Sequence, residues 1–136
     1  MQSLIYWFWR DLSELSRALA RSRLWTAYGL LEELRLKCVN LARLKHDFSS
    51  AWVVGYDKLE LAADKQELEA LRAAFCPLER EAMLEAVRAL VGFYLRTALP
   101  LAAQHGITYP ADLAAVVTEK LERRCSLHLD ARATEG

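Results

Sequence analysis

The stretch that decides the fold is residues 3–46, which read SLIYWFWRDLSELSRALARSRLWTAYGLLEELRLKCVNLARLKH. In its first half, apolar residues recur at intervals of three and four positions, the spacing that places them on one face of a helix. The residues of this stripe are Ile5, Phe8, Leu12, Leu15 and Leu19. The pattern predicts a helix from about Ser3 to Ala20.

The same period continues through the second half of the stretch and predicts a helix from about Ser22 to His46, with Ser22 as its N-cap. The apolar stripe of this helix comprises Leu24, Tyr28, Leu31, Leu34, Cys38 and Leu41. Only Arg21 and Ser22 separate the two predicted helices. We therefore expect an antiparallel helical hairpin at the N-terminus.

Four consecutive aromatic residues, Tyr6, Trp7, Phe8 and Trp9, lie near the start of the first helix. At 100° per residue, Phe8 joins the inward stripe, Trp9 and Trp7 lie about 90° and 110° to either side, and Tyr6 lies nearly opposite. One core cannot bury all four side chains. Clustered exposed aromatic residues usually mark a contact surface. We predict that Tyr6, Trp7 and Trp9 face a partner.

The segment DFSSAWVVGYDKLE, residues 47–60, breaks the helical period. We expect it to be irregular, and long irregular segments in compact domains are often functional. Helices are then predicted over about Asp64 to Phe75 (with Lys58 as an alternative start), over Pro77 to His105, and from Pro110 onward.

Within the long fourth helix, Pro100 is expected to introduce a kink, and Gly106 is expected to end the helix. The predicted fold is an all-α bundle of about five or six helices with the hairpin at its N-terminus. We expect residues 1–130 to form a single helical domain and residues 131–136 to form a disordered tail.

Composition restricts the classes of partner. The 136 residues contain 18 Lys and Arg and 18 Asp and Glu, so the chain lacks the basic excess of a generic nucleic-acid binder. The apolar run Leu4–Trp9 is far shorter than the ~20 residues that cross a bilayer. Met1-Gln2-Ser3 supplies neither the basic start nor the longer apolar centre of a signal peptide. We therefore predict no nucleic-acid partner, no membrane partner and a cytoplasmic location.

The cysteines and histidines are scattered. The three cysteines are Cys38, Cys76 and Cys125, and the three histidines are His46, His105 and His128. An odd number of cysteines without a Cys-x-x-Cys pair indicates reduced thiols. The histidines lack the spacing of metal ligands, so we predict no metal site. The chain also has no phosphate-binding glycine loop, nucleophile elbow or His-Glu-x-x-His motif, so we predict no catalytic residues.

The order of several features resembles the C-terminal helical domain of the aminoglycoside and lincosamide nucleotidyltransferases, especially the streptomycin type. In that family an aromatic pair opens a helix, a basic residue and a Trp begin the next, and an Arg follows. The matching residues are Phe8, Trp9, Arg21 or Arg23, Trp25 and Arg35, followed by Gly55-Tyr56-Asp57-Lys58 and Gly106-Ile107-Thr108-Tyr109-Pro110. The resemblance covers about residues 6 to 124.

This resemblance implies an antibiotic-resistance context. In that family a separate N-terminal domain binds ATP and Mg²⁺ and performs the transfer, while the helical domain forms one wall of the drug pocket. By this analogy, the present chain would hold no cofactor and would not catalyse transfer by itself. Its expected partners are a nucleotidyltransferase domain or a second copy of the chain, and an aminoglycoside-like small molecule.

Four residues are candidates for binding that small molecule: Trp25, Glu32, Asp57 and Lys58. A carboxylate pairs with an ammonium group, and an aromatic ring packs on the apolar face of a sugar. Simpler roles remain open at this point. Trp25 closes the hairpin turn in one alternative, and Glu32 pairs with Arg35 three residues later in another.

A different class of function is an oligomerisation or scaffold module of a toxin–antitoxin type, because helical modules of this general kind also occur in the HEPN group of ribonucleases, beside nucleotidyltransferases. An active ribonuclease of that group needs Arg-x(4–6)-His. Arg43 and His46 have only two residues between them and do not fit, whereas Arg123 and His128 have four between them and do fit this spacing. One match to so short a motif is weak evidence, so we do not predict ribonuclease activity.

Overall fold

The computed structural model describes residues 1–48, 55–127 and 129, and every regular element within these residues is a helix. The helices are α1 (Gln2–Ala20), α2 (Leu24–His46), α3 (Leu59–Ala62), α4 (Lys65–Arg72), α5 (Arg80–Gln104) and α6 (Ala111–Cys125). The all-α bundle and its N-terminal hairpin are therefore confirmed. The predicted tail, residues 131–136, lies outside the described residues.

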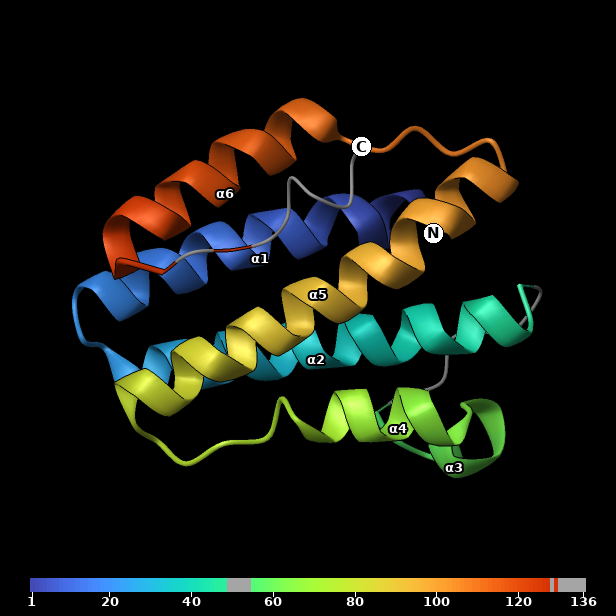
Figure 1. Cartoon of the computed structure of the whole chain (residues 1–136), viewed down its shortest axis with the longest axis horizontal. Coiled ribbons are helices and arrows are strands. Elements are labelled where there is room, and N and C mark those ends of the chain that lie inside the picture. Colours follow the sequence, from blue (N-terminus) through green and yellow to red (C-terminus); the bar gives the residue numbers. More distant parts are fainter. Residues whose placement is uncertain (49–54, 128, 130–136) are drawn as a thin grey trace.

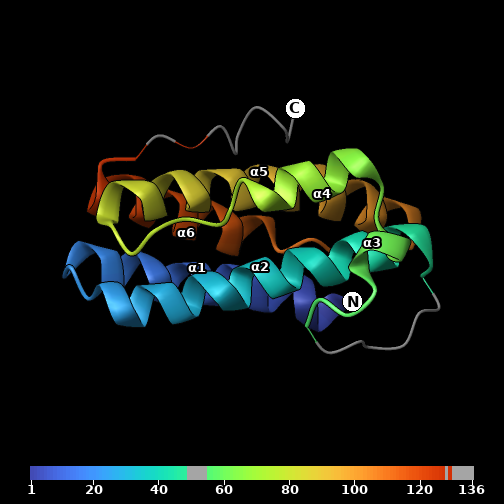
Figure 2. The ribbon, with the colours of Figure 1, turned by 90° about the horizontal axis from the view of Figure 1, so that it is seen from below.

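The helices pack in two layers around one core. Helices α1 and α2 lie side by side, α6 packs on the other side of α1, and α5 packs on α2 (Figure 1). The short helices α3 and α4 lie against α2, and α4 also contacts α5 (Figure 2). Because α2 contacts four other helices, namely α1, α3, α4 and α5, it is the central helix of the bundle.

The turn between α1 and α2 differs from the prediction. Ser22 does not cap α2, because it adopts a left-handed conformation with φ of 54°. The backbone N–H groups of Ser22 and Arg23 instead donate to the carbonyls of Leu19 and Ala18 and close the end of α1. This is the hydrogen-bond pattern of a Schellman motif. Helix α2 consequently begins at Leu24, with Arg23 at its N-cap position.

The apolar stripe of α1 is fully buried as predicted, but the burial extends further around the helix. Trp9, which we expected at a partner interface, is completely buried within the chain. It makes edge-on contacts with Phe8 and with Tyr94 of α5, with ring centroids 5.6 Å apart in each pair. The prediction for Trp9 is wrong because α1 is covered from two sides, so a wider arc of the helix faces the core.

Helix α5 begins later than predicted, at Arg80, with Glu79 in extended conformation before it. Pro100 lies inside the helix, and Gly106 follows its end with φ of 64°. Among the described residues, α5 is one helix that is long and apolar enough to cross a membrane by length and composition alone. However, 61% of that apolar window is buried in the bundle, as in a core helix.

Candidate functional site

Helix α2 carries a polar stripe on the side that faces α3 and α4. Its members are Glu32, Arg35, Arg43 and His46, which recur at multiples of three and four positions and therefore share one face. Arg35 and Arg43 are buried. The sequence alone shows the spacing, but it does not show which distant segments these side chains contact.

Arg35 joins α2 to the segment after α4. Its guanidinium pairs with Glu32, donates a hydrogen bond of 2.9 Å to the carbonyl oxygen of Ala74, and lies 4.1 Å from the centre of the Phe75 ring. The Tyr56 hydroxyl donates to the other carboxylate oxygen of Glu32 at 2.7 Å. Burial is the main cause that raises the pKa of Tyr56 above its usual value. Both carboxylate oxygens of Glu32 thus have partners within the chain.

Arg43 fixes the turn that precedes α3. Its Nη2 atom donates to the carbonyl oxygens of Asp57 at 2.8 Å and Gly55 at 3.3 Å. Two residues of this turn, Gly55 and Lys58, have left-handed backbone conformations. A buried guanidinium nitrogen that donates to carbonyl oxygens satisfies polar groups of the turn that would otherwise need water.

The four predicted ligand-binding residues are only partly brought together. The side chain of Tyr56 links Glu32 to the turn that contains Asp57 and Lys58, whose own side chains are exposed. Trp25 lies two turns before Glu32, roughly 10 Å away along the α2 axis. Its side chain is 82% exposed, so the alternative in which it closes the hairpin turn is wrong. A role in binding a small molecule stays a prediction for all four.

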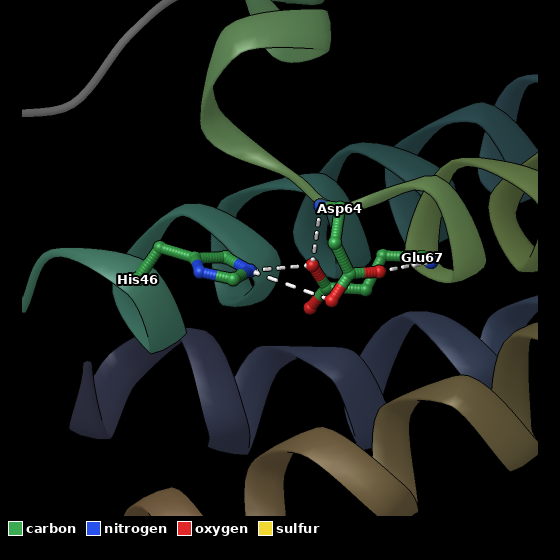
Figure 3. Close-up of side chains that lie close together, drawn as sticks. All are labelled: His46, Asp64 and Glu67. Carbon is green, nitrogen blue, oxygen red and sulfur yellow. Dashed lines mark hydrogen bonds and ion pairs between the residues drawn. The ribbon is translucent and has the colours of Figure 1, made fainter.

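At the end of the polar stripe, three potential metal ligands converge (Figure 3). His46 Nε2 lies 2.5 Å from a carboxylate oxygen of Glu67 and 4.0 Å from one of Asp64. Asp64 and Glu67 also form a capping box at the start of α4, in which each carboxylate accepts a backbone N–H of the other residue. The hydrogen bond from the Glu67 N–H is the main cause that lowers the pKa of Asp64.

This cluster borders a pocket of about 460 Å³ between the end of α2 and residues 61–64. Its wall includes His46, Asp64, Asp47 and Arg43. The ammonium group of Lys45 lies 3.4 Å from the second carboxylate oxygen of Glu67. Sequence reasoning missed the cluster because His46 and Glu67 are 21 residues apart and belong to different helices.

A separate surface lies at the start of α1. The side chains of Tyr6 and Trp7 are 39% and 48% exposed, as the helical period predicted. Their rings meet edge-on at 5.8 Å, and the Arg10 guanidinium lies 5.3 Å from the Trp7 ring. We call Tyr6, Trp7 and Arg10 the aromatic patch.

Comparison with known proteins assigns no relative to this arrangement: no protein-family model, curated protein or solved structure matches the chain.

Proposed function

We propose that this chain is a helical accessory module that docks onto a partner protein through the aromatic patch and does not catalyse a reaction alone. The observation that carries the proposal is the exposure of Tyr6 and Trp7, while Phe8 and Trp9 beside them are buried. When a partner covers two large aromatic side chains, the removal of their apolar surface from water favours binding. Aromatic residues and Arg are also enriched at protein interfaces.

The partner that we propose is a nucleotidyltransferase catalytic domain, on the basis of the resemblance to the helical domain of the streptomycin-type enzymes. In the assembled pair, ATP and Mg²⁺ would belong to the catalytic domain. The helical module would contribute a wall for an aminoglycoside-like substrate, with Trp25, Glu32, Asp57 and Lys58 as its candidate residues. Because Glu32 already pairs with Arg35 and Tyr56, the exposed Asp57 is the better-placed carboxylate for an ammonium group.

Light scattering tests the docking step directly. The chain is measured alone and mixed with a catalytic domain of the streptomycin adenylyltransferase type. The proposal predicts the mass of a one-to-one complex in the mixture. A dimer of the chain alone would support self-association, which is the scaffold alternative, and two unassociated monomers would contradict both.

Thermal shift measurements with streptomycin, a lincosamide and ATP test the substrate wall. We expect the unfolding temperature to rise with the drug only when the catalytic domain is present, since the wall is one half of the pocket. If no ligand raises the unfolding temperature, with or without the catalytic domain, the proposed substrate role is wrong. The docking proposal is tested separately by the mass measurement.

A further inference from the structure

We propose that His46, Asp64 and Glu67 form a binding site for one divalent transition-metal ion, with Zn²⁺ as the ion that fits best. The three residues each offer one ligand atom, and these atoms lie within 4.8 Å of one another. An imidazole nitrogen and two carboxylate oxygens are a ligand set that Zn²⁺ accepts. Ca²⁺ and Mg²⁺ prefer oxygen ligands alone, so the histidine favours Zn²⁺ over them.

The buried carboxylate of Glu67 gives the strongest argument. Its side chain is 8% exposed, and its Oε2 atom makes no hydrogen bond among the described residues but lies 3.4 Å from the half-exposed ammonium group of Lys45. The Oε1 atom accepts a hydrogen bond from the Asp64 N–H, and His46 Nε2 lies 2.5 Å from it. A buried carboxylate is costly unless its oxygens are held by close donors or a cation. A metal ion at this position would hold Oε2 more closely than the flexible Lys45 ammonium group does.

The capping box holds the two carboxylates in place for such an ion. The Glu67 N–H donates to Asp64 Oδ1 at 2.8 Å, and the Asp64 N–H donates to Glu67 Oε1 at 2.9 Å. The remaining oxygen of Asp64, Oδ2, is the one that lies 4.0 Å from His46. Hydrogen bonds that orient ligating carboxylates from behind are typical of metal sites. Three protein ligands would leave a coordination position for water from the adjoining pocket.

Two positively charged side chains, Arg43 and Lys45, lie near the proposed site and would repel a metal ion to different degrees. The Arg43 guanidinium lines the pocket but donates to the carbonyl oxygens of Gly55 and Asp57. Lys45 pairs with Glu67 Oε2 at 3.4 Å, and its side chain is half exposed. Its ammonium group can move into solvent when an ion binds, because a lysine side chain is long and flexible. Lys45 and the metal ion therefore compete for the same carboxylate oxygen.

This competition separates a metal site from a purely structural contact. If the cluster binds Zn²⁺, Lys45→Ala removes a competing cation and tightens zinc binding. If the cluster only links α2 to α4, Lys45→Ala leaves the chain without measurable zinc affinity.

The experiment is calorimetric titration of Zn²⁺ into the full chain after removal of metal with a chelator. Cys76→Ser serves as the background, because Cys76 is the thiol with partial exposure and could bind zinc itself. We expect one Zn²⁺ per chain and a higher unfolding temperature with zinc. His46→Gln and Glu67→Gln should each weaken binding at least about tenfold, and Lys45→Ala should strengthen it.

Two matched variants serve as controls. His105→Gln replaces an exposed histidine that stacks on Phe48, and Glu60→Gln replaces an exposed carboxylate of α3. Both should bind zinc like the background protein. Each variant is compared with its own metal-free unfolding temperature, so that a loss of stability is not read as a loss of binding. Absence of stoichiometric zinc binding, or equal affinity in His46→Gln and the background, would overturn the proposal.

Discussion

Two tryptophans separated by one position have opposite surroundings. Trp9 contacts Phe8 and Tyr94 in the core, whereas Trp7 is half exposed beside Arg10. A single apolar stripe places both tryptophans outside the core, because one stripe corresponds to one covered face of the helix. A helix period gives the direction of a side chain, but the number of neighbouring helices decides how wide the buried arc becomes.

Trp9→Ala should lower the free energy of unfolding by about 3–5 kcal/mol, because it empties a large volume in the core. Trp7→Ala should change it by only about 0.5 kcal/mol or less, since the side chain is at the surface. Urea denaturation of both variants measures the difference. Equal losses would contradict the burial of Trp9.

Arg35→Ala should destabilise the chain by about 2–4 kcal/mol, since it removes the donor to Glu32 Oε2 and to the Ala74 carbonyl. Arg35→Lys should recover only part of this loss, because one ammonium group cannot reproduce the planar fork. Arg88→Ala is the control, as Arg88 makes an exposed pair with Glu85 at 3.9 Å. Urea denaturation measures the free energy of unfolding of the three variants. A loss in Arg35→Ala no greater than that in Arg88→Ala would be inconsistent with a structural guanidinium.

The three thiols should react with iodoacetamide in a fixed order. Burial raises the pKa of Cys38, Cys76 and Cys125, which keeps all three protonated near neutral pH, and the thiolate is the reactive form. Cys76 is half-buried and should react first, at a rate that increases with pH. Cys38 and Cys125 are buried and should react only after unfolding. Mass spectrometry of timed samples identifies the modified residue, and early modification of Cys38 would contradict the packing.

At the scale of elements, sequence periodicity was sufficient to predict the main helices and the hairpin. It could not predict the contacts of the polar stripe on α2. Arg35 meets Ala74 across 39 residues, and Arg43 meets Asp57 across 14 residues. Local spacing carries no information about such distant partners. The same reason explains why His46 was interpreted as an isolated histidine although it contacts α4.

Helix α4 offers a pH-dependent test. The folded chain lowers the pKa of Asp64, so its carboxylate contributes stability above the ordinary aspartate pKa, and this contribution is lost as the pH falls through the lowered value. Asp64→Ala should therefore reduce the unfolding temperature at pH 7, and the reduction should shrink in acid. Circular dichroism melts in the presence of a chelator measure both. An effect of Asp64→Ala that is independent of pH would contradict an ionised cap.

At the scale of the whole molecule, the core and the exposed aromatic residues have separate roles. The stacked rings of Phe8 and Tyr94, 3.8 Å apart, fix α1 to α5 from inside the bundle. The aromatic patch lies on the exposed side of the same turns of α1, at the end of the helix away from the hairpin. A partner that docks there would contact a surface that the core already holds rigid, which lowers the entropic cost of binding.

Docking through the aromatic patch is tested by a binding titration of a streptomycin adenylyltransferase-type catalytic domain against the chain and two tryptophan variants. Trp7→Ser removes the centre of the aromatic patch, and Trp25→Ser removes a more exposed tryptophan at the hairpin end of α2. The account predicts that Trp7→Ser weakens binding about tenfold or more, while Trp25→Ser binds like the unmodified chain. Equal affinities for Trp7→Ser and the unmodified chain, or no binding by either, would contradict the claim that the aromatic patch is a docking surface for this partner.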